Sequence, residues 1–481
     1  MENNAIIIYG EIQKRGMVME FFRTNRTYCA LVLALFLFVF LGTEYLFDDR
    51  MASVTDAPGV VAAQSYILAA SVIGFAIFPV FYRCCKRYVA AFLLVAACLG
   101  SVICYYMICC HSSYQTILIA GVLLYIGMGV LGGAIHYGVI RILRHDPHLA
   151  AIVGCSYMAG IMLQFVNNNL VGKNSLETIL LSICSILLAG ITVFLFRQGD
   201  NLSTEKLQKQ SYITGAGIML VVCVLLMTII FATLDNVVTL YHAGGSMDIG
   251  QCPRLLLAFS GLIAGFLYDI RNRHYMNLIM YCVTLLSVIC VLLIVSGRFY
   301  FGGLPVFYLS AGFFAVYFTT SFMEYALYTG YPAFWAGFGR AVNNIGAGLI
   351  GSVSITMFEK RNFVLISMIA VVLFVCIHIA LYMYSGWMQK ITGNAVLTTG
   401  EKEEKRFADF AAQYHLTARE QEVLQALLES DDSVQNIAEQ LYISRAALYR
   451  HITSINKKTN TRSRVGLIQF YYGRDGEISK E

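Results

Sequence analysis

The stretch LTAREQEVL at residues 416–424, followed by IAEQLYIS at residues 437–444, decides how the C-terminal part of this chain folds. Thr417 and Glu420 have the spacing of a capping box, which predicts that a helix begins there. Ser444 is expected to cap a later helix. Two short helices joined by a tight turn, the second of them exposed and basic, have the geometry that enters the major groove of DNA.

Apolar residues recur at helical spacing along this C-terminal segment, as they do in amphipathic helices. Ser463 is expected to cap a fourth and last helix. We therefore expect a four-helix, wingless domain over residues 407–473, followed by a tail at 474–481. Its expected core consists of Val423, Leu424, Leu427, Leu428, Ile437, Leu441, Leu448, Ile452, Ile455, Val465, Leu467, Ile468 and Phe470.

The charges of residues 407–473 are sorted along the chain. All seven acidic residues fall between 409 and 439, and six of the seven basic residues fall between 445 and 464. A solvated helix face is the ordinary explanation of such a run, but here the basic end coincides with the expected second helix of the pair, where phosphate contacts are required. The candidate DNA-binding residues are Thr417, Ser444, Arg445, Ala446, Tyr449, Arg450, His451, Lys457, Lys458, Arg462 and Arg464.

This segment resembles the LuxR/FixJ (GerE-like) helix-turn-helix family. The family patterns L-T-x-R-E-x-E-V-L and I-A-x-x-L-x-I-S match residues 416–424 and 437–444 at every specified position. The positions that match further on are His451, Ile455, Lys458, Arg462 and Arg464. The resemblance implies binding to double-stranded DNA, with the last helix pairing two domains as a homodimer. The family's T-V-K is replaced on the recognition helix by Ala447, Leu448 and Tyr449, so the operator sequence stays open.

The rest of the chain is far more apolar than a soluble domain. Of its 481 residues, 58% are hydrophobic and 13% are charged, against about 25% charged residues in soluble domains. A membrane-spanning helix needs about 20 mostly apolar residues. Twelve stretches qualify, at 28–46, 60–82, 89–110, 115–140, 149–171, 177–196, 212–234, 252–268, 275–295, 304–328, 341–358 and 363–384. The chain is therefore predicted to be all-α, a polytopic twelve-helix bundle in a lipid bilayer followed by the C-terminal domain.

Loop charges orient these spans. With the N-terminus inside, the inner segments hold fifteen Lys and Arg residues and the outer loops hold six. The positive-inside rule therefore favours a cytoplasmic N-terminal tail at residues 1–27, in which no cleavable signal peptide is evident. Twelve crossings return the C-terminus to the same side. We expect a multi-pass protein of the cytoplasmic (inner) cell membrane with both termini in the cytoplasm, where DNA is.

The longest inner loop divides the membrane domain, residues 28–385, into two six-helix halves. The halves are expected at residues 28–196 and 212–384. A polar linker at residues 386–406 leads to the C-terminal domain; it can fray or continue as helix.

A loop motif supports a repeat of the two halves. GFLYDIRNR at residues 265–273 resembles the G-x-L-x-D-R-x-G-R loop of the major facilitator superfamily, with Asn272 at the second Gly. The first copy, 191 residues earlier, keeps Gly74 but has Phe78 in place of the Asp. The resemblance implies two six-helix bundles around a central cavity.

Ionisable side chains at membrane depth are costly and usually face a cavity or a partner. The candidates for ligand or proton sensing are Glu44, His136, Asp235, Glu324 and Arg340. The first four fall in the first, fourth, seventh and tenth spans, which line the central cavity in the resembled fold. Two alternatives stand beside a sensing role: a position at the water interface for Glu44 and Asp235, and a structural ion pair between Glu324 and Arg340.

The 14 cysteines sit mostly singly in apolar runs, without the spacing of a metal site. We expect packing roles for them, with an outer disulfide between Cys252 and Cys109 or Cys110 as the alternative. No nucleophile–base set or phosphate loop is evident in the sequence. We therefore expect no enzyme activity, no cofactor and no metal site.

These features predict a prokaryotic, membrane-bound transcriptional regulator. It would sense a small molecule through the membrane domain and bind DNA with the C-terminal helix-turn-helix. The main alternative is a proton-coupled small-solute transporter with an appended regulatory DNA-binding domain. A third is release of the DNA-binding part by proteolysis in the linker.

Overall fold

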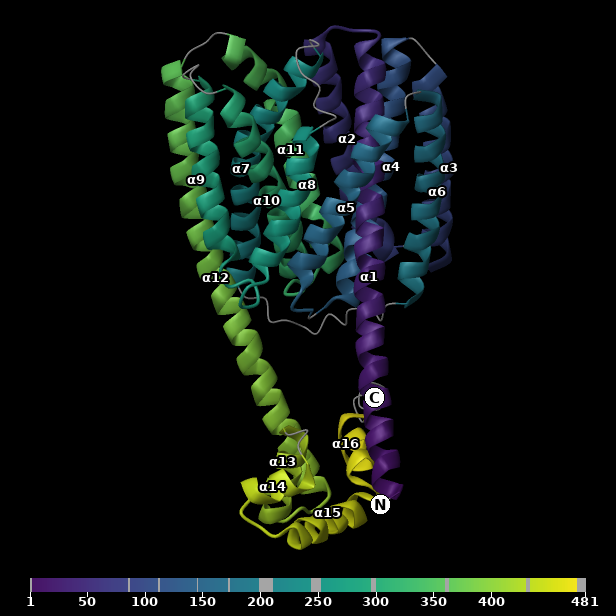
Figure 1. Cartoon of the computed structure of the whole chain (residues 1–481), viewed down its shortest axis with the longest axis vertical. Helices are drawn as coiled ribbons and strands as arrows, with labels where there is room; N and C mark the ends of the chain where they lie inside the picture. The colour runs from purple at the N-terminus through teal and green to yellow at the C-terminus, as the bar shows by residue number, and fades with distance from the viewer. Residues whose placement is uncertain are drawn as a thin grey trace. The chain divides into compact units, whose positions relative to one another are not determined.

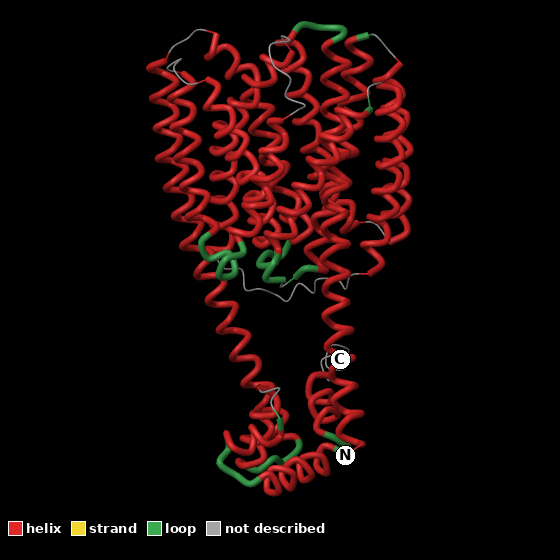
Figure 2. Tube along the Cα trace, viewed as in Figure 1, coloured by secondary structure: helices red, strands yellow, loops and turns green. Residues whose placement is uncertain are grey.

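The computed structural model describes residues 2–84, 87–110, 113–144, 146–171, 174–198, 211–243, 252–295, 300–359, 363–429 and 433–473. Side chains are described for the same ranges except 2–24, 87–98, 196–198, 211–212, 233–243, 252–253, 293–295, 300–304, 351–359, 363, 394–405 and 472–473. The expected tail at 474–481 lies outside them. In the described ranges the regular elements are helices, which confirms the all-α prediction (Figure 2).

The described residues of the membrane part form twelve helices, and each corresponds in order to one predicted span (Figure 1). They are α1 (Glu2–Ala52), α2 (Ala57–Cys84), α3 (Arg87–Cys110), α4 (Tyr114–Ile142), α5 (Leu149–Leu170), α6 (Asn174–Gln198), α7 (Ser211–Ala243), α8 (Cys252–Tyr268), α9 (Met276–Val295), α10 (Tyr300–Ala326), α11 (Pro332–Glu359) and α12 (Phe363–Gln413). Eight of them hold a described stretch long and apolar enough to cross a membrane, and α3, α8 and α9 hold shorter apolar stretches. The chain is thus a multi-pass membrane protein.

Four helices extend well beyond the predicted spans, and one of them is α7, which ends at Ala243 instead of residue 234. α11 begins at Pro332, earlier than expected, because proline is favoured at the first helical position, whereas the apolar run used for prediction starts only after Arg340. α1 begins at Glu2, so the expected tail is helical. α12 continues to Gln413, so the polar segment 386–406 continues as helix.

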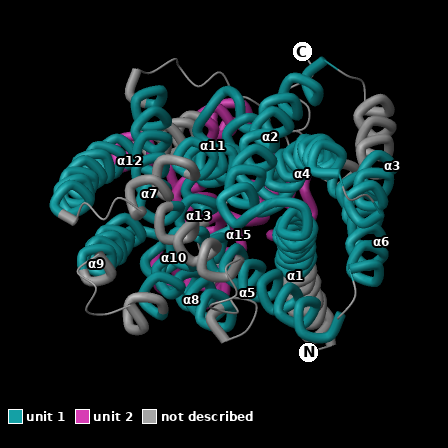
Figure 3. Tube along the Cα trace, turned by 90° about the horizontal axis from the view of Figure 1, so that it is seen from above, with its two compact units in different colours: residues 1–388 teal, residues 389–481 magenta. Residues whose placement is uncertain are grey.

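The chain divides into two compact units, residues 1–388 and 389–481 (Figure 3). In the first unit, α9 and α12 lie at one edge of the bundle, and α3 and α6 lie at the opposite edge (Figures 1 and 3). α12 exposes Val364, Val372 and Tyr382 there. Exposed apolar side chains on an edge helix are suited to contact with lipid tails.

Close helix contacts repeat in the two halves of the first unit. α2 and α4 meet at Gly74 and Gly129, where a Cβ on Gly129 would lie 2.0 Å from the Ser71 carbonyl oxygen. α8 and α10 meet in the same way at Gly312, where a Cβ would lie 2.8 Å from the Leu257 carbonyl oxygen. Only glycine permits backbones to approach so closely. The repeat of the α2–α4 contact six helices later agrees with two related halves.

The halves meet through α5 with α8 and through α2 with α11. A Cβ on Gly154 of α5 would lie 2.8 Å from the Cα of Gly265, the first residue of the loop motif. Between α11 and α2, Asn344 Nδ2 donates to Ser71 Oγ at 2.8 Å. One contact thus depends on backbone proximity and the other includes a buried hydrogen bond.

The second unit contains the end of α12 and four shorter helices. These are α13 (Ala418–Glu429), α14 (Val434–Gln440), α15 (Arg445–Thr459) and α16 (Arg464–Gly473). Their buried core consists of Phe410, Ala411, Leu416, Val423, Leu424, Leu427, Ile437, Ala438, Leu448, Ile452, Ile455, Leu467 and Tyr471. The prediction for Val465 is wrong: it is 39% exposed. α16 packs through Leu467 and Tyr471, which share one helix face, so Val465 is turned away.

Candidate functional site

A buried carboxylate organises the start of α13. Glu420 accepts hydrogen bonds from the Thr417 backbone N–H at 2.7 Å and from its hydroxyl at 3.0 Å, while Thr417 Oγ1 accepts from the Glu420 N–H at 3.3 Å. This reciprocal arrangement confirms the predicted capping box. Glu420 also accepts from Ser454 Oγ at 2.7 Å and from Lys458 Nζ at 2.6 Å, both on α15. One side chain therefore caps α13 and ties it to α15.

These hydrogen bonds keep Glu420 charged. Burial raises its pKa, but the bonds from Lys458, Thr417 and Ser454 outweigh burial and lower the pKa to about 2. Lys458 Nζ also donates to the His415 carbonyl oxygen at 2.9 Å. Two candidate DNA-binding residues, Thr417 and Lys458, therefore donate hydrogen bonds to Glu420 within the domain.

The turn between α14 and α15 orients the second helix of the pair. Ser444 caps α15 as predicted, since its Oγ accepts from the Ala447 N–H at 3.2 Å. Arg419 Nη2 donates to the Leu441 carbonyl oxygen at 2.8 Å, which links α13 to this turn. Tyr442 adopts a left-handed conformation in the turn, with φ 54°. The geometry of helix, turn and helix is thus held by the Ser444 cap and by Arg419.

α15 has a buried face and an exposed cationic face. Leu448, Ile452 and Ile455 lie in the core. The exposed side chains of α15 include Arg445, Ala446, Tyr449, Arg450, Thr453 and Lys457. The Arg445 guanidinium lies over the Tyr449 ring, 5.7 Å from its centroid. Beyond this face, Arg462 is exposed, and His451 and Arg464 are half-buried. The exposed face of α15 is the candidate surface for the major groove.

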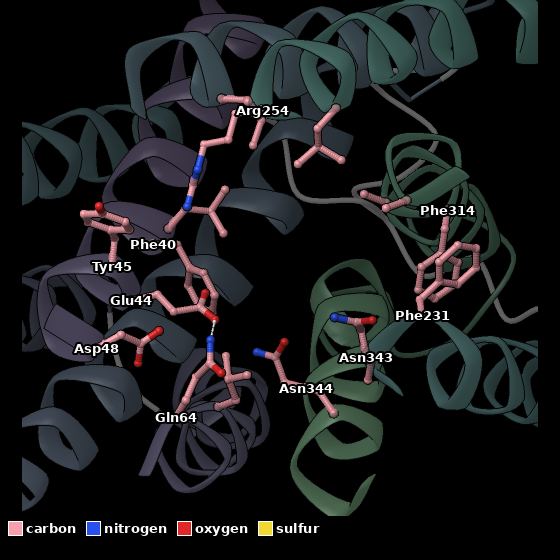
Figure 4. A pocket seen from close by; sticks show the side chains of 18 of the residues that line it. Phe40, Glu44, Tyr45, Asp48, Gln64, Phe231, Arg254, Phe314, Asn343 and Asn344 are labelled. Atoms are coloured by element: carbon pink, nitrogen blue, oxygen red, sulfur yellow. Dashed lines mark hydrogen bonds between the residues drawn. The ribbon is translucent and has the colours of Figure 1, made fainter. Parts of the chain in front are cut away.

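The first unit holds a second candidate site, a cavity of about 410 Å³. Residues of α1, α2, α5, α7, α8, α10 and α11 form its walls. Its polar lining consists of Glu44, Asp48, Asp49, Gln64, Arg254, Arg340, Asn343 and Asn344 (Figure 4). Asp49 and Ala52, at the end of α1, belong to the lining and are exposed. The cavity therefore reaches the end of the bundle at which α1 ends and α2 begins.

Two of the predicted sensing residues line this cavity. Glu44 Oε1 accepts from Gln64 Nε2 at 2.7 Å (Figure 4). Arg340 lies 5.7 Å from the centroid of the Phe40 ring and 5.1 Å from that of the Phe318 ring. Sequence spacing had placed Glu44 and Arg340 in different halves, and the fold brings them to one space.

His136 does not line this cavity. His136 is buried, and its Nδ1 lies 2.7 Å from the Gly132 carbonyl oxygen of its own helix. None of the lining residues belongs to α4, so the expectation that the fourth span lines the cavity is not met there. Asp235 falls in α7, outside the residues whose side chains the structure describes.

Glu324 belongs to a separate network at the loop motif. Arg273 Nε lies 3.0 Å from Glu324 Oε1, and its Nη1 lies 3.4 Å from Asp269 Oδ1. Asp269 also accepts the Ala151 N–H at 2.7 Å, at the start of α5, where a helix favours negative charge. The alternative pair of Glu324 with Arg340 is therefore wrong, because Glu324 pairs with Arg273. The motif joins α5, α8 and α10.

Sequence reasoning missed four polar residues of the cavity, Asp48, Asp49, Gln64 and Arg254. Each falls near the end of an apolar run, where a polar residue is read as a boundary or loop residue. Asp48 had a usable signal, because its spacing of four from Glu44 places both on one helix face. Glu177 was also missed; it is buried and accepts from Asn167 Nδ2 at 2.6 Å.

The part of the chain that is described contains neither a metal-binding cluster nor a disulfide at Cys109 or Cys110. No group of three or more His, Cys, Asp or Glu residues there could hold a metal ion. Cys109 and Cys110 are free thiols, contrary to the alternative of an outer disulfide. The side chain of Cys252 lies outside the described residues.

Comparison with known proteins agrees with this division of the chain. Residues 414–471 match the luxR family of bacterial regulatory proteins (GerE). The structure resembles that of an auto-inhibited POT family peptide transporter, at 11% identity and a TM-score of 0.53, over 75% of this chain and 96% of the other. It also resembles the human organic anion transporter MFSD10 (TETRAN), at 13% identity and a TM-score of 0.53, over 76% of this chain and 99% of the other. A search of curated proteins finds no match.

The protein is thus a multi-pass membrane protein that carries a helix-turn-helix domain. Its C-terminal residues form a LuxR-type domain, which implies that it binds DNA. Its membrane part has a fold like that of major facilitator transporters, and both kinds of domain are typically non-enzymatic.

Proposed function

We propose that this protein is a membrane-bound transcriptional regulator that senses a small molecule in the cavity of its membrane domain and binds DNA as a homodimer. Both termini would lie in the cytoplasm. The observation that supports this most directly is the presence of a LuxR-type domain and a multi-pass domain on one continuous helix, α12. Tyr384 of α12 is buried in the first unit and Phe410 in the core of the second.

In this proposal the signal is a ligand that binds in the cavity. A ligand that favours one state of the bundle shifts its conformational equilibrium by the difference between its affinities for the two states. Because α12 contributes to both cores, a shift in its membrane part would alter how two C-terminal domains pair on DNA. The exposed residues Arg445, Tyr449, Arg450 and Lys457 would then contact the operator.

The test is to map the sites that the full-length protein occupies on chromosomal DNA. We expect discrete sites, which Arg450→Ala weakens because an exposed charge on α15 is lost. We also expect Glu44→Gln combined with Arg340→Met to change occupancy at the same sites. Unchanged occupancy in this double variant, with normal membrane insertion, would refute sensing through the cavity.

The second candidate function is a proton-coupled small-solute transporter with an appended regulatory DNA-binding domain. The likeness of the fold to transporters and the carboxylates of the cavity favour it. It predicts solute uptake by the purified protein in vesicles, abolished by Glu44→Gln. A regulator without transport predicts saturable binding and no uptake in the same vesicles.

A further inference from the structure

The cavity in the membrane domain presents opposite charges on different helices. Glu44 and Asp48 lie one helical turn apart on α1. Arg254 comes from α8 and Arg340 from α11, in the second half of the bundle. The Arg254 guanidinium lies over the Tyr45 ring, 5.5 Å from its centroid. The carboxylates therefore come from the first half of the chain and the guanidinium groups from the second.

Among the residues whose side chains are described, Arg340 forms no ion pair within 4 Å, and the Glu44 carboxylate acts on its charge only from farther away. Its Nε is buried and has no hydrogen-bond partner there, and its guanidinium contacts the Phe40 and Phe318 rings instead. A charged side chain at membrane depth is costly unless an opposite charge compensates it. A carboxylate is the natural partner, because it matches the planar fork of a guanidinium group. An anionic group that enters the cavity would therefore compensate the charge of Arg340.

Glu44 and Asp48 supply carboxylates that can bind a positively charged group of a ligand. Gln64 orients the Glu44 carboxylate through the hydrogen bond at 2.7 Å. Figure 4 shows Asp48 beside Glu44, with both side chains at one wall and Asn343 and Asn344 across the open space. Two carboxylates one turn apart attract a protonated amine.

Aromatic and aliphatic side chains form most of the remaining wall. Phe231 stacks on Phe314, with ring centroids 4.6 Å apart and planes inclined by 9° (Figure 4). Such a surface suits a hydrocarbon or aromatic body. The cavity volume of about 410 Å³ lies in the range of small-molecule sites, roughly 300 to 1,000 Å³.

We propose that this cavity binds a small zwitterion, an amino-carboxylate whose carboxylate meets Arg340 and whose ammonium group meets Glu44 and Asp48. Its apolar body would lie against Phe231 and Phe314. The role of this compound as a signal rests on the proposed regulatory function, but its binding does not.

The experiment measures the thermal stability of the full-length protein in detergent with a panel of zwitterions. The panel holds the twenty common L-amino acids, their dipeptides with glycine and the linear ω-amino acids, so that the distance between the two charges varies. A ligand that binds only the folded state raises the melting temperature. For the best member, the N-acetyl and carboxamide derivatives remove one charge each. We expect each derivative to bind at least about tenfold more weakly, or ~1.4 kcal/mol.

Two variants assign the ends of the ligand. Glu44→Gln combined with Asp48→Asn is expected to bind the parent and the N-acetyl compound equally, and Arg340→Met the parent and the carboxamide equally. Arg340→Met should also leave the ligand-free protein as stable as before or more so, because it removes a buried charge that forms no close ion pair. A purely structural arginine would lower stability instead. Glu177→Gln, a buried acid outside the cavity lining, is the matched control and should bind the parent normally.

Several results would overturn the proposal. They are the absence of any stabilisation across the panel at millimolar concentration, or a derivative that binds as tightly as its parent. Loss of affinity in Glu177→Gln equal to that in Glu44→Gln combined with Asp48→Asn would also overturn it. Because binding is read without DNA, a bound zwitterion with unchanged DNA occupancy in cells refutes the regulatory role alone.

Discussion

Replacing Glu420 by Gln should loosen the DNA-binding domain, because this buried side chain caps α13 and ties it to α15. Glu420 is 4% exposed and accepts hydrogen bonds from Thr417, Ser454 and Lys458. The substitution keeps the shape of the side chain but removes its charge. It therefore weakens the cap of α13 and the link between α13 and α15 together, while leaving a polar group in place.

The expected magnitude follows from the pKa of Glu420. The native environment lowers this pKa from 4.5 to about 2, and each pKa unit corresponds to about 1.4 kcal/mol. The full difference is then about 3 kcal/mol in favour of the charged form. Lys458 is 31% exposed, so solvent screens part of its contribution. We expect a loss of about 2 kcal/mol, or roughly a 30-fold rise in local opening.

The pH dependence has a defined direction. Because the folded-state pKa lies below the unfolded one, the stabilisation is fully present above about pH 4.5. It is lost as the pH falls toward 2, when the carboxylate becomes protonated in the native state too. The difference in stability between the natural protein and Glu420→Gln should therefore shrink over this interval.

Hydrogen exchange on the full-length protein in detergent measures this opening, read on peptides from α13 and α15. Glu422→Gln is the matched control, because Glu422 pairs with Arg419 at the surface, where a salt bridge contributes about 0 to 1 kcal/mol. We expect clearly faster exchange for Glu420→Gln and little change for Glu422→Gln. Equal rates in the two variants would refute the argument from burial and hydrogen bonding.

Further predictions concern the membrane domain and the recognition helix. Arg273→Ala leaves two carboxylates without their arginine partner and should lower the free energy of unfolding by about 3 kcal/mol. Arg271→Ala, at an exposed position, should leave that free energy nearly unchanged. Equal losses in the two variants would contradict the network. Gly129→Ala forces a Cβ against the backbone of α2 and should cost about 3 kcal/mol, whereas Gly127→Ala, two residues away and uncrowded, should be neutral or slightly stabilising; a tolerated Gly129→Ala would contradict the close approach. Tyr449→Ala should change which DNA sequence is preferred by about 1–3 kcal/mol of discrimination while the dependence of binding on salt stays the same, as measured on a library of DNA sites at two salt concentrations.

Much of the fold follows from local patterns in the chain. Runs of apolar residues marked all twelve membrane helices, because a helix in lipid must satisfy its own backbone hydrogen bonds and expose apolar side chains. The caps at Thr417, Ser444 and Ser463 were found because a cap and the N–H groups it binds lie within three residues. The error at Val465 arose because neighbouring elements, and not the local pattern, determine which face a helix buries. At Pro332 the apolar run used for the prediction hid a local signal, since proline is favoured at the first helical position.

The candidate sites were found only in part. Glu44 and Arg340 were recognised as costly charges at membrane depth, but their meeting in one cavity was not predictable from their spacing. Glu324, which the alternative interpretation paired with Arg340, pairs with Arg273 at 3.0 Å instead. Spacing along one helix cannot decide which side chain on another helix becomes the partner. In the folded chain, each ionisable group can have several oppositely charged groups close by.

The amino-acid sequence by itself determined the two kinds of domain, the number and order of the helices, and the residues that begin and cap the C-terminal ones. Each of these depends on residues close together in the chain. Only the tertiary structure decided that Lys458 pairs with Glu420 and that a charged cavity lies between the two halves. Such sites depend on contacts like that of Asn344 with Ser71, 273 residues apart. The physical reason is that helix formation is local, whereas the compensation of buried charge depends on which helices pack together.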